Sequence, residues 1–540
     1  MTGLLLSILM VTAPVTPAAA PLPDTLVVCP PAWTSTLQPW IDYRRGQGHR
    51  IAVIPSAGSY EKVRTALHSQ AKKGVTKAIL LVGDAPPDKA TPQTRARTVA
   101  TQYVPAKVNI HWGSEPLIAT DNGYADLDGD GVADLSIGRI PADSAAELAT
   151  YIQRVIAYET PQQNNRWRRR INLIAGVGGF GPVTDRLIEA TAKQFLVTEI
   201  PASYATSMTQ ASWRSPYCPD PRTFQQTTLQ RINEGCLFWV YMGHGQRRYL
   251  DQIRVPANKR YAIFNSSHVN QLKAQKNPPI AIFLACYTGA YDDAEDCLAE
   301  QMLRQPGGPI AVLAGSRVTM PYAMSIMGQG LIRGYFQQRA DTLGEVVLVA
   351  KQQLIAPTPS ATKAAQWNRR MLDTMATLLS PKPELIEAER REHLSLFNLL
   401  GDPLLRLPHP QQLQISSPSN VIAGSELLVT VTSPWAATAS VELVCQRGTQ
   451  KQQIGTRTAY LDEDQALKKY NQIYEQANDQ VWTQVQVRLS KGSQQFKLPV
   501  PPAATGSCFV RIFAEGEKRY ALGACPVFIN QQESNPSDSR

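Results

Sequence analysis

Apolar runs and amphipathic helical segments alternate along the first 160 residues. Apolar runs of strand length occupy 25–29, 50–55 and 78–83, and residues 60–72 have the spacing of a helix. Ser144 and Glu147 form a capping-box pattern, after which apolar residues recur at helical spacing up to residue 156. This alternation predicts a parallel sheet covered by helices, in an N-terminal α/β subdomain over residues 21–160.

A second α/β subdomain is predicted over residues 165–408. Its apolar runs lie at 171–177, 236–242, 280–286 and 310–315. Several are apolar throughout, as expected of strands that are buried on both faces of a sheet. The arginine-rich segment 166–170 is interpreted as a solvated linker that leads into the first of these strands.

The pattern changes after Pro410. Short, often alternating runs at 426–433, 439–445, 481–490 and 508–515 are separated by Gly, Pro and Ser. They predict a β-sandwich domain over residues 411–530, followed by a disordered tail at 531–540. The predicted fold class is therefore an α/β domain with a parallel sheet in two subdomains, followed by an immunoglobulin-like β-sandwich.

The N-terminus resembles a secretion signal. Residues 3–13 are an apolar run, and small residues at 18–20 offer a cleavage site, which predicts a signal peptide over residues 1–20. No Lys or Arg precedes the run, and Pro21 follows the site; the alternative is a buried N-terminal strand. No other segment reaches the roughly eighteen apolar residues of a membrane span. The sequence thus predicts a secreted or cell-envelope protein without integral membrane association.

Amino-acid composition excludes only a few classes of protein. The chain has 540 residues, 43% of them hydrophobic and 18% charged, which excludes collagen-like and wholly disordered proteins. The net charge of +10 favours acidic surfaces in general, and no nucleic-acid partner is predicted. The eight cysteines have no metal-site spacing. Cys445, Cys508 and Cys525 lie in one β-rich region, where one pair can be bridged.

Two motifs suggest ligands. Residues 176–181 fit G-x-G-x-x-G, and Glu199 follows the next apolar run, as in a dinucleotide site; a tight strand-to-helix turn explains the glycines equally. Calcium is suggested by acids at positions 1, 3, 5 and 9 of a calcium-loop pattern, although position 12 is Ile137. The alternative is a polar turn. The four acids are Asp126, Asp128, Asp130 and Asp134.

Two apolar runs end in residues that carry chemistry. The run at 236–242 leads into Gly243-His244-Gly245, and the run at 280–286 ends in Cys286. Carboxyl ends of parallel strands meet at one edge of a sheet, so we expect His244 and Cys286 to lie close together. A thiol and an imidazole are the nucleophile and base of a cysteine hydrolase. The backbone N–H groups of Gly245 and Cys286 would form its oxyanion hole.

These strand ends and three further segments, five segments in all, resemble the gingipain family within the caspase-like superfamily of cysteine peptidases. The segments are 137–159, 243–245, 283–303, 306–317 and 397–408, in an order that spans about residues 25–408. A β-sandwich after the catalytic domain is also similar to that family. The resemblance implies that Cys286 is the nucleophile and His244 the general base and acid. It also implies that an acid before the Gly-Arg strand end orients the histidine, a place that Asp134 occupies here.

The resulting hypothesis is a secreted cysteine endopeptidase that acts on proteins or peptides through a thioester acyl-enzyme, with calcium and no organic cofactor. Its alternatives are a transpeptidase or sortase-like enzyme on the same fold, a non-catalytic extracellular binding protein, and a dehydrogenase. A preference for Arg or Lys at P1 is one interpretation of four acids after the nucleophile; a solvated helix start is the other. These acids are Asp292, Asp293, Glu295 and Asp296.

Overall fold

The computed structural model describes residues 22–56, 58–86, 90–161, 165–178, 199–356, 363–380 and 382–531. The predicted signal peptide and residues 532–540 of the predicted tail lie outside these ranges.

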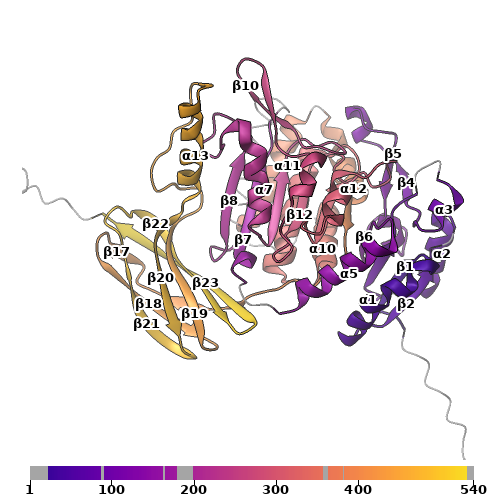
Figure 1. The fold of residues 1–540 in the computed structure, drawn as a ribbon, viewed down its shortest axis with the longest axis horizontal. Helices are drawn as coiled ribbons and strands as arrows, with labels where there is room; N and C mark the ends of the chain where they lie inside the picture. Colours follow the sequence, from indigo (N-terminus) through magenta and orange to yellow (C-terminus); the bar gives the residue numbers. More distant parts are fainter. Residues whose placement is uncertain are drawn as a thin grey trace, which may run out of the picture.

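One ten-stranded sheet runs through both α/β subdomains (Figure 1). Its order is β2-β1-β3-β6-β14-β13-β12-β9-β7-β8. The N-terminal subdomain contributes β1 (Thr25–Cys29), β2 (Ile51–Pro55), β3 (Ala78–Val82) and β6 (Ser136–Ile140). The second subdomain contributes β7 (Arg170–Ala175), β8 (Ala205–Gln210), β9 (Phe238–Met242), β12 (Ile280–Leu284), β13 (Ala311–Gly315) and β14 (Phe397–Leu400).

The two halves of this sheet run in opposite directions. Strands are parallel within each half, but β14 is antiparallel to β13 and meets β6 in parallel through the pair Leu400 and Arg139. The amino end of β6 therefore faces the same edge of the sheet as the carboxyl ends of β9, β12 and β13. The predicted α/β fold class is confirmed, and β14 is an addition that the sequence analysis did not contain.

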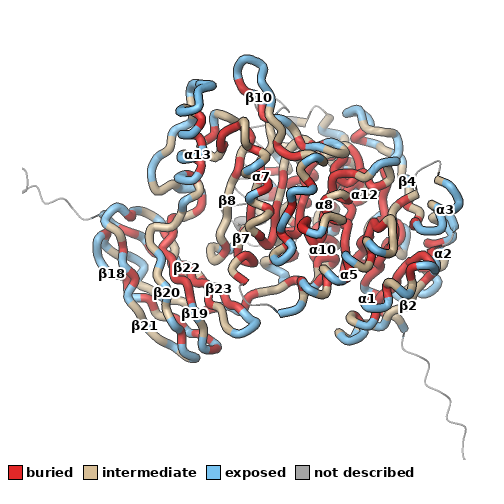
Figure 2. The backbone as a smooth tube through the Cα atoms, in the orientation of Figure 1, coloured by how far each residue is buried: buried red, intermediate tan, exposed pale blue. Residues whose placement is uncertain are grey.

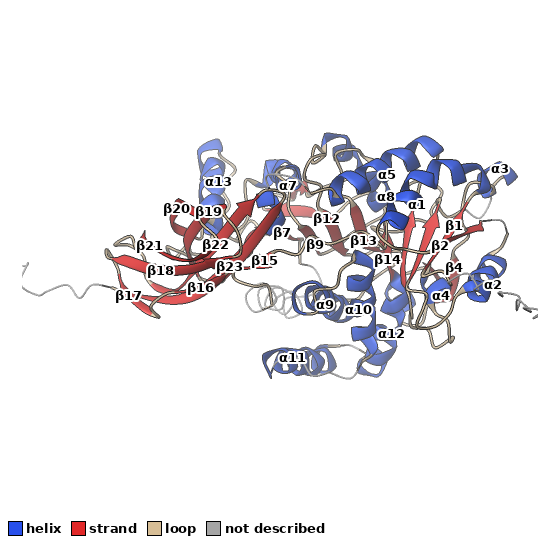
Figure 3. Cartoon of the chain, turned by 90° about the horizontal axis from the view of Figure 1, so that it is seen from below, coloured by secondary structure: helices blue, strands red, loops and turns tan. Residues whose placement is uncertain are grey.

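Helices cover both faces of the sheet (Figure 3). α5 starts where the capping box predicts, because Ser144 Oγ accepts the N–H of Glu147 at 3.2 Å. Buried residues follow the strands and the inner sides of the helices (Figure 2). The helices are α1 (Thr34–Gly46), α2 (Tyr60–Gln70), α3 (Pro92–Arg95), α4 (Asn122–Ala125), α5 (Ala145–Glu159), α7 (Phe224–Asn233), α8 (Leu298–Arg304), α9 (Pro321–Ile332), α10 (Leu343–Ile355), α11 (Lys363–Leu379) and α12 (Ile386–Leu396).

Two antiparallel hairpins lie outside the main sheet. β4 (Gln102–Pro105) pairs with β5 (Leu117–Thr120), and β10 (Gln252–Val255) pairs with β11 (Lys259–Ala262). The β4–β5 hairpin belongs to the N-terminal subdomain by sequence but contacts α12 of the second subdomain. Neither hairpin was predicted, since each is only four residues long on either side.

The C-terminal region forms two packed sheets with a core of their own. One sheet has the order β15-β23-β22-β19-β20, with β17 beside β23, and the other has the order β16-β18-β21. The strands are β15 (Gln411–Gln412), β16 (Gln414–Ser416), β17 (Asn420–Ile422), β18 (Glu426–Ser433), β19 (Ala437–Cys445), β20 (Val481–Leu489), β21 (Gly492–Pro499), β22 (Gly506–Gly516) and β23 (Arg519–Asn530).

A helix, α13 (Asp464–Asn478), interrupts the β-rich region and was not predicted. Its buried residues Leu467, Tyr470 and Tyr474 have helical spacing, a signal that the surrounding strand pattern obscured. α13 lies beside β8 (Figure 1), where the Asn478 side chain exchanges two hydrogen bonds with the backbone of Met208, at 2.7 and 3.0 Å.

The arginine-rich segment 166–170 is not a solvated linker. Arg168 and Arg169 are buried, and Arg169 donates to Glu442 of β19, with Nη2 and Oε1 2.5 Å apart. Arg511 of β22 pairs with the same carboxylate at 2.7 Å. A contact with the sandwich therefore accounts for Arg169 and for Arg166, whereas Arg168 donates to the carbonyl oxygen of Tyr158 at 2.9 Å. We call Arg166, Arg169, Arg511 and Glu442 the sandwich joint.

Candidate active site

His244 and Cys286 emerge at the same edge of the sheet from neighbouring parallel strands. Met242 of β9 pairs with Leu284 of β12, and each candidate residue lies two positions beyond its member of this pair. The two loops touch, because a Cβ added at Gly245 would lie 2.7 Å from the carbonyl oxygen of Cys286. Only glycine fits this approach. We call this edge, with the loops that carry His244 and Cys286, the His/Cys edge.

Cys286 differs from the other cysteines of the chain. Its side chain is partly exposed, whereas the other seven are buried, and all eight are free thiols. Burial raises the pKa of Cys29 and of Cys218 to about 12, so these thiols are protonated near neutral pH. The sulfur of Cys286 accepts the N–H of Thr319 at 3.3 Å, a donor that can stabilise negative charge on it.

Hydrogen bonds to backbone atoms hold the loop of His244 in place. Tyr241 donates its hydroxyl to the carbonyl oxygen of His244 at 2.7 Å, and the N–H of Gly243 donates to Leu284 of β12 at 3.2 Å. A Cβ at Gly243 would lie 2.9 Å from the Cα of Gly176 in the next strand end. The imidazole itself is partly exposed.

The N–H groups predicted to form an oxyanion hole are available. Within the described ranges, neither the N–H of Gly245 nor that of Cys286 donates a hydrogen bond to the protein. By contrast, the N–H of Tyr287 donates to the Arg317 carbonyl at 3.1 Å.

The structure does not bring Asp134 to His244. Asp134 precedes β6, and three strands separate β6 from β9, a distance of about 19 Å at ~4.8 Å per strand. Its carboxylate instead accepts the N–H of Leu127 at 2.9 Å and pairs with Lys73 at 3.1 Å. The expected role of Asp134 in orienting the histidine is corrected accordingly: this acid belongs to the loop before β6.

Three of the four candidate calcium ligands lie together. Carboxylate oxygens of Asp126, Asp128 and Asp130 lie within 4.8 Å of one another, which suits oxygen ligands at ~2.4 Å from a calcium ion. Asp126 also accepts the N–H groups of Gly129 and Gly131, at 2.7 and 2.9 Å. Asp134 is not part of this group.

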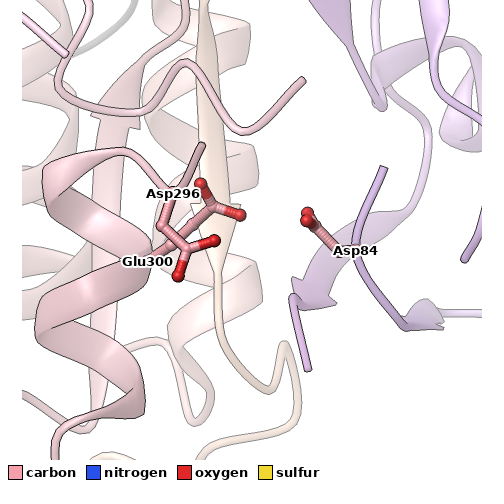
Figure 4. Close-up of side chains that lie close together, drawn as sticks. All are labelled: Asp84, Asp296 and Glu300. Carbon is pink, nitrogen blue, oxygen red and sulfur yellow. The ribbon is translucent and has the colours of Figure 1, made fainter. Parts of the chain in front are cut away.

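A second acidic group lies at the junction of the two subdomains and was missed, because its members are far apart in sequence. Asp84 follows β3 and faces Asp296 and Glu300 across the junction (Figure 4). Burial, together with the neighbouring Asp84, raises the pKa of Glu300 well above its usual value. Arg304 lies among these acids, 2.6 Å from Asp296 and 3.7 Å from Glu300.

The four acids that follow the nucleophile all pair with arginines of the chain. Because each of them has a cationic partner, they do not form a free anionic pocket for a P1 side chain, and the side chain of Asp292 is only 9% exposed beside its partner. The pairs are Asp292 with Arg317, Asp293 with Arg247, Glu295 with Arg248 and Asp296 with Arg304, at 2.6–2.9 Å.

The glycine motif is only partly described. Gly176 packs tightly, since an added Cβ would lie 2.5 Å from the hydroxyl oxygen of Tyr241, while residues 179–181 lie outside the described ranges. Glu199 accepts a hydrogen bond from Gln337 at 3.0 Å.

An α/β sheet with a cysteine and a histidine at the ends of neighbouring parallel strands is typical of Cys/His hydrolases. The sequence profile of peptidase family C25 matches residues 18–408, and the chain belongs to that family. The predicted family resemblance is thereby confirmed.

Known proteins of the same kind are similar over most of the chain. Gingipain R2 of Porphyromonas gingivalis strain W83 is 22% identical over 417 residues, which cover 74% of this chain and 48% of that protein. Gingipain R1 of Porphyromonas gingivalis is 23% identical over 327 residues, 59% of this chain and 28% of that protein. The chain thus spans about half the length of the first relative and less of the second.

Solved structures share the fold. The crystal structure of the Arg specific cysteine proteinase gingipain R superposes with a TM-score of 0.52 at 16% identity, covering 95% of this chain and all of that one. A complex of the pro- and mature domains of RgpB from Porphyromonas gingivalis gives a TM-score of 0.50 at 18% identity, covering 94% of this chain and 100% of that chain.

Proposed function

We propose that this chain is a cysteine endopeptidase in which Cys286 attacks the peptide carbonyl and His244 moves the proton. The observation that carries the proposal is the register of β9 and β12, which places both residues two positions beyond one strand pair. The partly exposed thiol of Cys286 distinguishes it from the seven buried ones. Family membership supports protein or peptide substrates.

The reaction would proceed in two displacements. His244 accepts the thiol proton as the sulfur bonds to the carbonyl carbon, and the N–H groups of Gly245 and Cys286 stabilise the oxyanion. The imidazolium then protonates the leaving amine, and a thioester remains on Cys286. Water, deprotonated by His244, attacks the thioester and releases the acid and the thiol. An exogenous amine in place of water would give transpeptidation.

The decisive test compares the full chain with its Cys286→Ala variant on a fluorogenic peptide library varied at P1. We expect cleavage by the wild-type chain and a loss on the order of 10⁴-fold or more in the variant. Equal cleavage by both proteins would exclude Cys286 as the nucleophile. Adding an amine nucleophile and analysing the products by mass spectrometry separates hydrolysis from ligation.

We also propose an extracytoplasmic location, supported by the signal-like N-terminal sequence and by the gingipain relatives. None of the helices in the described ranges combines the length and apolar character of a membrane span. N-terminal sequencing of the protein secreted by an expressing bacterium tests this proposal, with cleavage expected after Ala20.

Calcium is proposed at Asp126, Asp128 and Asp130. Lys73 Nζ lies 2.9 Å from Asp128 and therefore competes with a cation there. The Lys73→Ala variant should gain stabilisation by calcium, measured as the rise in melting temperature between EDTA and excess calcium. The Asp128→Asn variant should lose it. Identical shifts in wild type and both variants would place any calcium effect elsewhere.

A further inference from the structure

The connection of the β4–β5 hairpin carries a carboxylate from the N-terminal subdomain to the His/Cys edge. This carboxylate is Glu115. On one side of it, Glu392 of α12 accepts the backbone N–H groups of residues 107–109 at 2.6–2.8 Å. On the other side, Arg317 Nε donates to the carbonyl of Leu117 at 3.0 Å. The second subdomain thus anchors both sides of the connection and fixes the place of Glu115.

Glu115 binds one residue from each of the two loops of the His/Cys edge. Tyr287 donates its hydroxyl to Oε2 at 2.7 Å, and Arg247 Nη2 donates to Oε1 at 2.5 Å. The guanidinium of Arg247 also lies over the ring of Tyr287, 4.7 Å from its centroid. Three side chains therefore form one contact unit, which we call the Glu115 clamp.

The clamp lies close in sequence to the proposed reacting groups. Tyr287 directly follows Cys286 and has φ +56°, a left-handed conformation that is costly for a residue with a side chain. Arg247 is three residues beyond His244. Such a backbone conformation persists only when its surroundings hold it, and the Tyr287 hydroxyl bond to Glu115 is one of these restraints.

The pKa values of Glu115 and Tyr287 favour the hydrogen bonds of the clamp at neutral pH. Burial would raise the pKa of Glu115, but the hydrogen bonds from Tyr287 and Arg247 outweigh it and hold this pKa below its usual value. Burial and the bond to Glu115 raise the pKa of Tyr287 to about 12. At neutral pH the clamp is therefore a carboxylate that accepts from a phenol and a guanidinium.

We propose that Glu115 is a positioning residue, which sets the His244 loop against the Cys286 loop and so fixes the distance between imidazole and thiol. This inference rests on the proposed function. Glu115 and Arg247 are about a third exposed, and Arg247 keeps a second partner, Asp293, at 2.8 Å. Loss of the clamp should therefore disturb the geometry of the edge more than the stability of the fold.

The test replaces Glu115 by Gln, which keeps the shape but presents an amide to Arg247. Glu295→Gln is the matched control, because Glu295 pairs with the adjacent Arg248 at 2.9 Å and is largely exposed. We expect Glu115→Gln to lower kcat by about 10- to 100-fold, the range that misplacement of reacting groups produces, with KM changed less than about threefold. The control should stay within about twofold.

Alkylation of Cys286 by iodoacetamide at pH 7, followed by peptide mass spectrometry, gives a second readout that needs no peptidase activity. Glu115→Gln should slow it about tenfold, and Tyr287→Phe, which removes only the hydroxyl, should slow it in the same direction. Wild-type rates of alkylation in both variants would overturn the inference, even if peptide cleavage confirmed Cys286 as the nucleophile. If no peptide were cleaved at all, the alkylation rates alone would decide.

Discussion

Two clusters in this molecule are each built around one carboxylate that accepts hydrogen bonds from arginine, yet the two carboxylates differ in burial. Glu442 of the sandwich joint is 1% exposed and meets Arg169 and Arg511. Glu115 of the clamp is 38% exposed and meets Arg247, with Arg317 3.7 Å away. The first joins two domains, and the second joins two loops.

Burial decides what each cluster can do. Burial alone would raise the pKa of Glu442, but Arg511 and Arg169 outweigh it and lower this pKa to about 2. Removing one partner from such a buried group leaves uncompensated charge, which is expensive. An exposed pair is screened by water and contributes little to stability. The joint should therefore control stability, and the clamp should control geometry.

Glu442→Gln should produce the largest stability change. We expect a loss of about 3–5 kcal/mol in the free energy of unfolding, because the arginines of the joint then stay buried without their anion. Denaturant unfolding of the full chain measures it. The lowered pKa of Glu442 in the folded state also predicts a pH effect: the stabilisation by Glu442 is present above pH ~4.5 and is lost as pH falls through about 2.

The control for this variant is Glu426→Gln, which breaks an exposed sandwich pair with Lys497 at 2.7 Å and should cost less than about 1 kcal/mol. Cys286 alkylation should be unchanged in both variants at temperatures where they are folded. Equal unfolding energies for the two variants, or slower alkylation in Glu442→Gln, would remove the distinction between joint and clamp.

The cysteines of the β-sandwich differ from Cys286 at the His/Cys edge, because two of them lie opposite each other on neighbouring strands. Cys445 and Cys508 face each other on β19 and β22, and the bond from the N–H of Gln446 to Ser507 makes them a non-hydrogen-bonded pair. Cα atoms of such a pair lie about 4.5 Å apart, which a disulfide can span. Oxidised glutathione should exchange with this pair, forming the protein disulfide and releasing two reduced glutathione molecules.

The expected result, in the Cys286→Ala background, is two fewer free thiols and a gain of about 2–4 kcal/mol in unfolding free energy, reversed by a dithiol reductant. Thiol counting after denaturation measures the first. Cys525→Ser should leave the loss of two thiols intact, whereas Cys445→Ser should abolish it. Loss of thiols in Cys445→Ser would assign the bridge to another pair.

The His/Cys edge could be predicted because its signal is local. An apolar run of strand length ending in His244 or Cys286 indicates both the strand and the place where it ends, and parallel pairing then aligns the two ends. The prediction for Asp134 was wrong because it depended on strand order, which is not a local property. The loop of Asp134 was recognised, but no local pattern indicates how many strands separate β6 from β9.

Long-range partners leave even less trace in sequence. Glu115 lies in the connection between β4 and β5, and nothing near it in sequence indicates Tyr287 or Arg247 as partners. In sequence, Arg166 and Arg169 look like part of a solvated run, but Glu442, over 270 residues later, pairs with both. A charged segment that is neutralised by a distant partner has the same local amino-acid composition as a charged segment exposed to solvent.

The smallest expected effect concerns the acids at the subdomain junction, where charge is neither neutralised as at the joint nor exposed as at the clamp. Burial raises the pKa of Asp84 to about 6, and that of Glu300 is also raised. Arg304 is shared with Asp296, Asp143 and, at 3.8 Å, Glu147. Acids with raised pKa values bind more protons in the folded state, so the contribution of these acids to stability is fully present below pH ~4 and is lost as pH rises through about 6.

We expect the melting temperature to fall by roughly 1–3 °C between pH 5 and pH 8 in EDTA through these acids, and Glu300→Gln to flatten this dependence. Asp128→Asn is the control, since its acid lies in a separate group and should leave the slope unchanged. Arg139 lies near Asp84 but pairs with Asp121 and does not titrate in this range. A slope that persists in Glu300→Gln would mean that other groups carry the pH dependence, and that the junction acids are neutralised as fully as Glu442 is at the joint.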